Sequence, residues 1–175
     1  MKTRIALILV EIALLAVTAS LRAEEKATPA SARRLEAIKQ LAGDWVEVGK
    51  DGKPTDRVVS SIRVTSAGSA VLETLFPGTD HEMVTLYHLD GAELILTHYC
   101  MMGNQPRMRA EAGKDINTIV FKFIGGTNMK STDDRHMHQA TLVLEGKDRF
   151  KAEWVSCQDG KTCHQVRFDL VRKQK

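Results

Sequence analysis

The chain has 175 residues, with 25 basic and 22 acidic side chains and a formal net charge of +3. The charges are mixed in sign along the chain and form no basic block, so the sequence argues against a nucleic-acid-binding surface, which needs a concentrated basic patch. The length is sufficient for one domain with a sizeable hydrophobic core.

The first 23 residues have the pattern of a secretory signal peptide. Lys2 and Arg4 precede an apolar run over residues 5–19, and the small residue Ala23 precedes the expected cut. Removal of this segment takes away three basic side chains and one acidic one, which lowers the net charge from +3 to +1. We therefore expect a periplasmic or secreted protein with no membrane attachment after the signal is removed.

Residues 24–42 are predicted to form a polar linker followed by a short helix. Thr28-Pro29 suits the start of a helix, and Leu35, Ile38 and Leu41 recur at a spacing near 3.6 residues. One narrow apolar stripe means that this helix must pack against another part of the molecule.

From residue 43 to residue 175 the apolar residues recur with a period of two, which indicates strands. The expected strands are residues 45–48, 57–65, 69–76, 82–89, 92–101, 107–111, 116–124, 137–145, 150–157 and 163–172. Short strands joined by turn sequences, with no helices between them, are typical of an antiparallel barrel. The sequence therefore predicts an all-β fold: an up-and-down barrel of about 8–10 strands with a short N-terminal helix.

Residues 81–108 contain an unusual number of histidine, tyrosine, cysteine and methionine side chains and read as a hairpin around Asp90-Gly91. If Glu93 faces water, then His98 and Cys100 face the interior. The partner strand has two alternatives. A two-residue turn at Asp90-Gly91, which the turn chemistry favours, points Met83, Thr85 and Tyr87 inward, whereas a three-residue turn that includes Ala92 points Val84, Leu86 and His88 inward.

The last two strands align around Gly160. This register pairs Phe150 with Leu170, Ala152 with Phe168 and Trp154 with Val166, so that each inward residue meets another. It also places Cys157 opposite Cys163 on the outer face, close enough for a disulfide, and leaves Cys100 free. The alternation of the preceding strand places His136 and His138 on the inward side.

Gly43-Asp44-Trp45, at the end of the short helix and the start of the first strand, resembles the G-x-W signature of the lipocalins and the wider calycin group. The resemblance covers roughly residues 32–175 and implies a barrel whose closed end is formed by Trp45 with an arginine of the last strand packed over it. Arg172 has the matching position. In this reading Gly43, Trp45 and Arg172 are structural residues.

The stretch HEMVTLYHLDG…LTHYC…GNQPRM is also similar to an uncharacterised bacterial family of lipocalin-like proteins, which brings no established activity. A more distant resemblance is to the nitrobindin-like barrels, in which a histidine binds haem. The glycine-rich segment that follows the G-x-W there is replaced here by Val46-Glu47-Val48-Gly49.

The interior histidines define the candidate sites. His136 and His138, two residues apart on one strand, point the same way and with His98 form a possible zinc-ligand set; any of them is a possible haem ligand. The reading that the sequence favours is a binding protein without a cofactor, which holds a small, mostly apolar molecule inside the barrel. Its polar and aromatic contacts would come from Thr85, Tyr87, His98, His138 and Trp154. A haem or metal protein is the alternative, a barrel hydrolase or isomerase is the second alternative, and the oligomeric state stays open.

Overall fold

A computed structural model of the chain describes residues 29–113 and 115–174, and it shows an all-β barrel with one short α-helix. The helix α2 comprises Ala30–Lys39, and a single 3-10 turn, η1, comprises Ser66–Gly68. The strands are β1 (Gly43–Val48), β2 (Pro54–Thr65), β3 (Ala70–Leu75), β4 (Met83–Asp90), β5 (Glu93–Tyr99), β6 (Gln105–Ala110), β7 (Thr118–Thr127), β8 (His136–Leu144), β9 (Arg149–Gln158) and β10 (Lys161–Arg172). The predicted fold class is confirmed.

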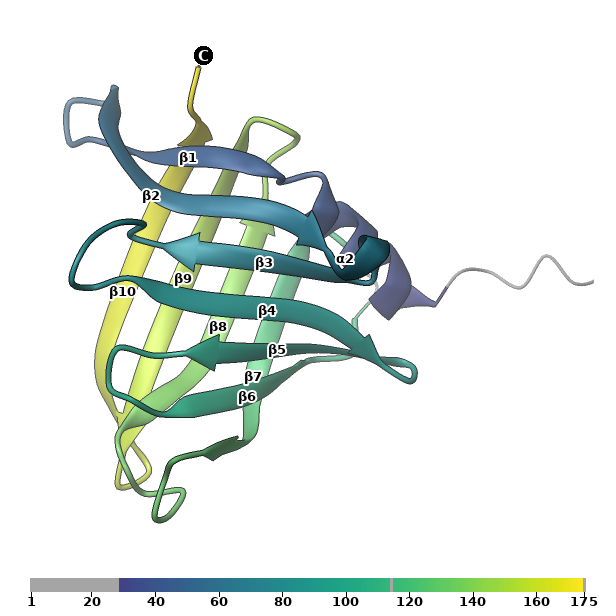
Figure 1. Cartoon of the computed structure of the whole chain (residues 1–175), viewed down its shortest axis with the longest axis vertical. Coiled ribbons are helices and arrows are strands. Elements are labelled where there is room, and N and C mark those ends of the chain that lie inside the picture. The colour runs from purple at the N-terminus through teal and green to yellow at the C-terminus, as the bar shows by residue number, and fades with distance from the viewer. Residues whose placement is uncertain (1–28, 114, 175) are drawn as a thin grey trace, which may run out of the picture.

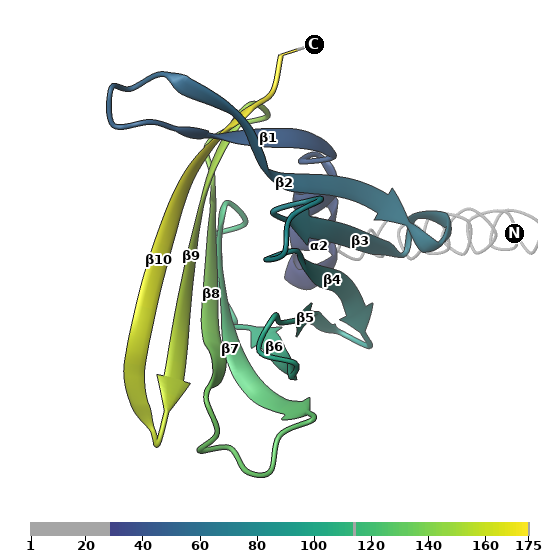
Figure 2. The same cartoon turned by 60° about the vertical axis from the view of Figure 1, so that its left-hand side comes forward.

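The ten strands form one closed antiparallel barrel in which each strand pairs with its neighbours in the sequence, and β10 pairs with β1 to close it. Figure 2 shows β7–β10 along one side, β2–β6 along the other, and β1 crossing above them. The β1–β10 ladder contains only three pairs, from Trp45 opposite Arg172 to Glu47 opposite Leu170. In the described chain the rest of β10, residues 161–169, is therefore paired with β9 alone.

The helix lies at the end of the barrel where β1 begins and β10 ends, which we call the helix end (Figure 1). Leu35, Ile38 and Leu41 are fully buried and join the core of the barrel. Arg34 on the same helix is also buried and donates hydrogen bonds to the backbone carbonyls of Glu111, Gly113 and Asp115, at 2.7–3.2 Å. The helix is thus fixed to the barrel by an apolar stripe and by one buried guanidinium whose donors are satisfied by carbonyl oxygens.

Trp45 and Arg172 meet at the helix end as the sequence resemblance implied. The Arg172 guanidinium carbon lies 4.5 Å from the centroid of the buried Trp45 ring, and the indole Nε1 donates to the Leu41 carbonyl at 2.7 Å. Gly43 is required beside them for two reasons. Its φ is +137°, and a Cβ atom at this position would lie 2.7 Å from Arg172 Nη1.

The hairpin β4–β5 has the inward face that the sequence favoured. Thr85 lies opposite His98, Tyr87 lies opposite Leu96, and all four side chains are buried. The turn itself differs by one residue: Asp90 pairs with Glu93, so the two loop residues are Gly91 and Ala92. Because both registers keep the same alternation, the facing of the strand is unaffected.

Two β-bulges alter the predicted facing near the other end of the barrel. In β10 the register shifts between Thr162 and His164, so Cys157 lies opposite Thr162 and the pairing of Cys157 with Cys163 predicted from the alternation is wrong. In β8 the register shifts between Met137 and Gln139, so His138 is the extra residue of this bulge. Met137, not His138, therefore lies opposite the inward-facing Ser156, because one extra residue in a strand reverses the alternation beyond it.

Candidate functional site

The end of the barrel opposite the helix, which we call the mouth, contains a pocket of about 410 Å³. It lies between the two halves of the barrel, at the side where β10 is not paired with β1. Its walls are mostly apolar and rich in sulfur: Phe76, Met83, Cys100, Met101, Met102, Met137, Val166 and Phe168. Arg135, Ser156 and His164 are the remaining lining residues.

Strand register explains why these residues meet. Val84 lies opposite Tyr99, so Met83 and Cys100, one step further along the same ladder, come together at its end. On the other half of the barrel, Met137 lies opposite Ser156, which lies opposite His164. The pocket is thus bounded by two rows of side chains on facing halves of the barrel.

Ser156 is the most unusual residue of the pocket. It is 2% exposed, and its Oγ atom has no hydrogen-bond partner. A buried hydroxyl without a partner costs free energy in the unliganded protein, and a ligand with a hydrogen-bonding group would recover it. This orphan hydroxyl is what distinguishes the pocket from a simple gap in the packing.

Four of the five residues predicted to contact a ligand lie one layer deeper, in the packed core. Thr85, Tyr87, His98 and Trp154 are each at most 3% exposed. The Thr85 hydroxyl and His98 Nδ1 are 2.9 Å apart, and the His98 and Trp154 rings pack at 4.7 Å between centroids. Burial lowers the pKa of His98 to about 4, so the ring is neutral at pH 7. This layer supports the base of the pocket, because Met83 is two residues before Thr85 on β4, Cys100 is two residues after His98, and Ser156 is two residues after Trp154 on β9.

A buried carboxyl group in the same region was not predicted. Glu73 on β3 accepts hydrogen bonds from Ser60 Oγ at 2.7 Å and from the Tyr87 hydroxyl at 2.6 Å. Burial raises the pKa of Glu73, although the two donated bonds oppose the shift, and it raises the pKa of Tyr87 as well. Since both carboxyl oxygens are engaged within the core, the group has a structural role. The sequence did contain a signal for this buried carboxyl group: Val71, Glu73 and Leu75 alternate along one strand, which places Glu73 on the same inward face as the two apolar residues.

The remaining predicted ligand residue, His138, contacts His136. His136 Nδ1 lies 2.6 Å from the Asp134 carbonyl and therefore donates to it, and His136 Nε2 lies 3.0 Å from His138 Nδ1. The Phe123 ring packs on His136 at 4.0 Å between centroids. Burial lowers the pKa of His138, with further contributions from His136 and Lys122.

The predicted zinc-ligand set is not assembled. Within residues 29–113 and 115–174, no three histidine, cysteine or acidic side chains are gathered closely enough to hold a metal ion. His136 and His138 bond to one another, whereas His98 packs on Trp154. The three cysteines are all free, with Cys100 and Cys157 buried and Cys163 exposed, so the predicted disulfide is not formed in this structure.

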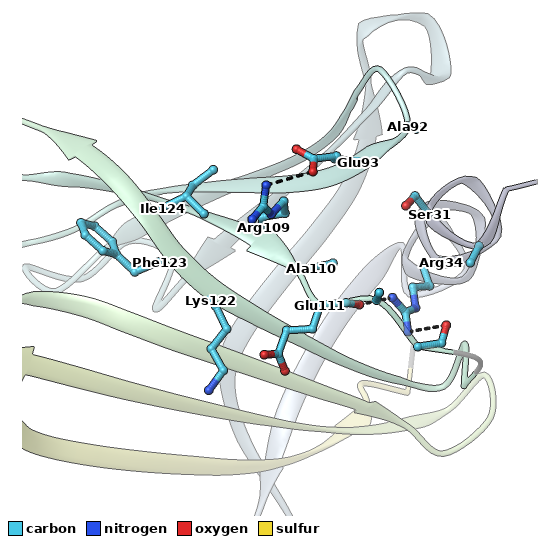
Figure 3. A pocket seen from close by; sticks show the side chains of 13 residues that line it. Ser31, Arg34, Ala92, Glu93, Arg109, Ala110, Glu111, Lys122, Phe123 and Ile124 are labelled. Atoms are coloured by element: carbon cyan, nitrogen blue, oxygen red, sulfur yellow. Dashed lines mark hydrogen bonds and ion pairs between the residues drawn. The ribbon is translucent and has the colours of Figure 1, made fainter.

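A larger groove of about 970 Å³ runs between the start of α2 and β5–β7 (Figure 3). Its charged side chains other than Glu111 already have partners. Arg34 is bonded to backbone carbonyls, and Arg109 Nη1 pairs with Glu93 at 3.0 Å. Lys122 donates to Gln139. A ligand that bound Arg34, Arg109 or Lys122 would have to replace bonds that exist, whereas the pocket at the mouth offers a buried hydroxyl that has none.

Neither a scan against protein-family models nor a search of curated proteins finds a match to the chain. In the part of the chain that the structure describes, no helix has the length and apolar character needed to cross a bilayer.

Proposed function

We propose that the protein is an exported barrel that binds a small, mostly apolar molecule in the pocket at its mouth. The observation that carries this proposal is an apolar pocket with one buried hydroxyl, Ser156 Oγ, that lacks a partner. Binding sites for small molecules combine an apolar lining with a few placed polar groups, and a volume of about 410 Å³ is of the size that such sites have.

The lining can adapt to apolar ligands of different shapes. Met83 and Met137 are flexible, polarisable side chains that adapt to different apolar surfaces. Met101 and Met102 are exposed at the rim and so add apolar surface around the opening. Phe76 and Phe168, whose rings are 5.8 Å apart between centroids, supply a more rigid wall.

Native mass spectrometry of the exported protein, purified without detergent, tests for a retained molecule. A neutral fluorescent probe, N-phenyl-1-naphthylamine, measures the affinity of the pocket for an apolar molecule directly. Met137→Gln places a polar amide in the lining and should weaken probe binding. Leu89→Gln makes the same kind of change at an exposed position near the helix end and should leave binding unchanged.

Ser156→Ala provides the sharper test of the hydroxyl. The variant should be as stable as the parent or more so, because it removes a buried group that has no partner. Binding of a retained ligand should weaken by about fivefold, the equivalent of one hydrogen bond of about 1 kcal/mol. Equal affinity for the probe in Met137→Gln and the parent would refute the pocket as the binding site.

Export is the second part of the proposal, and the predicted signal segment, residues 1–23, lies outside the described residues. The mature protein from the periplasm or medium should begin after Ala23, as measured by the mass of the intact chain. A full-length mass in the soluble cell extract would refute it.

A further inference from the structure

We propose that the mouth also contains a site for a soft monovalent metal ion, Cu(I) or Ag(I), with Cys100 and Met83 as its central ligands. Five of the eleven residues that line the pocket bear sulfur: Met83, Cys100, Met101, Met102 and Met137. Thiolate and thioether sulfur favour soft ions such as Cu(I), whereas carboxylate, carbonyl and water oxygen suit hard ions.

The register places the two central sulfur ligands together. Met83 and Cys100 lie one step beyond Val84 and Tyr99, the last pair of the β4–β5 ladder, and both line the pocket; opposed residues in such a ladder have Cβ atoms about 5 Å apart. The long Met83 side chain is able to span such a separation towards the Cys100 thiol. A two- or three-coordinate ion needs at most one further donor.

The turn after Cys100 supplies such a donor. Met101 and Met102 directly follow Cys100, line the same pocket and are 56% and 39% exposed, so they have room to rotate. Met137 on β8 and the exposed His164 on β10 lie on the other wall and provide alternative donors. The unpartnered Ser156 hydroxyl between them is a separate sign that this pocket takes a ligand.

The charge of the pocket favours a monovalent ion. A thiolate with Cu(I) is neutral. A thiolate with a divalent ion would leave a positive charge in an apolar pocket beside Arg135, and burial of such a charge is costly.

This site differs from the histidine set expected from the sequence. Its ligands are sulfur atoms at the mouth, and neither His136 nor His138 lines the pocket. It shares the pocket with the proposed apolar ligand, so the two occupants are measured separately, the ion by metal titration and the apolar ligand with the fluorescent probe.

The test is a titration of the reduced mature protein, which begins after Ala23, with Cu(I). Bicinchoninate, whose Cu(I) complex is coloured, competes for the ion. We expect one tightly bound ion per chain and copper–sulfur distances near 2.3 Å by X-ray absorption. Met83→Leu keeps the size and apolar character of the side chain, and it should weaken Cu(I) binding by at least about tenfold. Cys163→Ser removes the exposed thiol and should change neither stoichiometry nor affinity.

The site would be overturned by no binding in competition with bicinchoninate, by binding that is lost in Cys163→Ser, or by equal affinity in Met83→Leu and the parent. Zn²⁺ bound at this pocket as tightly as Cu(I) would also contradict it. The Met83→Leu variant keeps Cys100 in place, so it tests the site even if the Cys100→Ser variant is unstable. Failure of the probe to bind would refute only the proposed apolar ligand.

Discussion

Arg172 joins three segments of the chain at the helix end, and its removal should be one of the more destabilising changes in the protein. Its guanidinium donates to the carbonyls of Ala42 and Gln40 after the helix, at 2.7 and 3.1 Å, and to the Lys147 carbonyl in the β8–β9 turn. It also lies over the Trp45 ring.

The expected loss follows from these contacts. Three hydrogen bonds at about 1 kcal/mol each, with a cation–π contact of about 0.5–1 kcal/mol, amount to about 3 kcal/mol for Arg172→Ala once partial exposure of the side chain is allowed for. Arg172→Lys keeps the charge but lacks the planar fork, so it should recover only a part of this.

Urea denaturation followed by tryptophan fluorescence measures the change, since Trp45 and Trp154 are both buried. Arg149→Ala is the control: this arginine, on the neighbouring β9, forms a partly exposed ion pair with Asp169 through two hydrogen bonds, and its removal should cost less than that of Arg172. If Arg172→Ala were no less stable to urea than Arg149→Ala, the structural role assigned to Arg172 would be wrong.

Three further predictions concern the core. Gly43→Ala should destabilise the barrel by about 2 kcal/mol through backbone strain and the clash with Arg172, and by less when Arg172→Ala is also present, which a double-mutant cycle measures. The pKa of His98 falls from 6.5 to about 4 on folding, so the unfolded chain binds the proton more strongly than the folded one. The free energy of unfolding should therefore fall by about 3 kcal/mol as the pH drops from 6.5 to 4. His98→Gln should remove this fall. The pKa of Glu73 is raised on folding, so the folded state holds the proton more strongly and stability should decline as the pH rises above 4.5. Glu73→Gln should abolish that decline in denaturation curves at successive pH values, and an unchanged decline would show that another group causes it.

Most of the barrel could be predicted from its alternation. The pairs Phe150–Leu170 and Trp154–Val166 lie as the sequence indicates, because apolar residues at every second position specify the inward face strongly. The facing of β4 followed from the turn chemistry, even though the loop residues are shifted by one.

The candidate site was harder to predict because bulges have no clear pattern in one sequence. The extra residues at Cys163 and His138 reversed the alternation just where the strands reach the mouth. As a result, Met137 was not predicted as a pocket residue, and Cys157 was paired with the wrong position. Ser156 also gives no sign of its missing partner until the surrounding atoms are known.

The short β1–β10 ladder leaves this barrel with something that closed barrels usually lack, a free strand edge. Along residues 161–169 the outer backbone groups of β10 could pair with a strand from a second copy of the chain, which is the usual route to aggregation. Three features oppose it: the bulge at Cys163, the charged side chains of Lys161 and Arg167, and the curvature that the bulge imposes. The bulge that displaces Cys163 from its expected partner thus also protects the protein's most vulnerable edge.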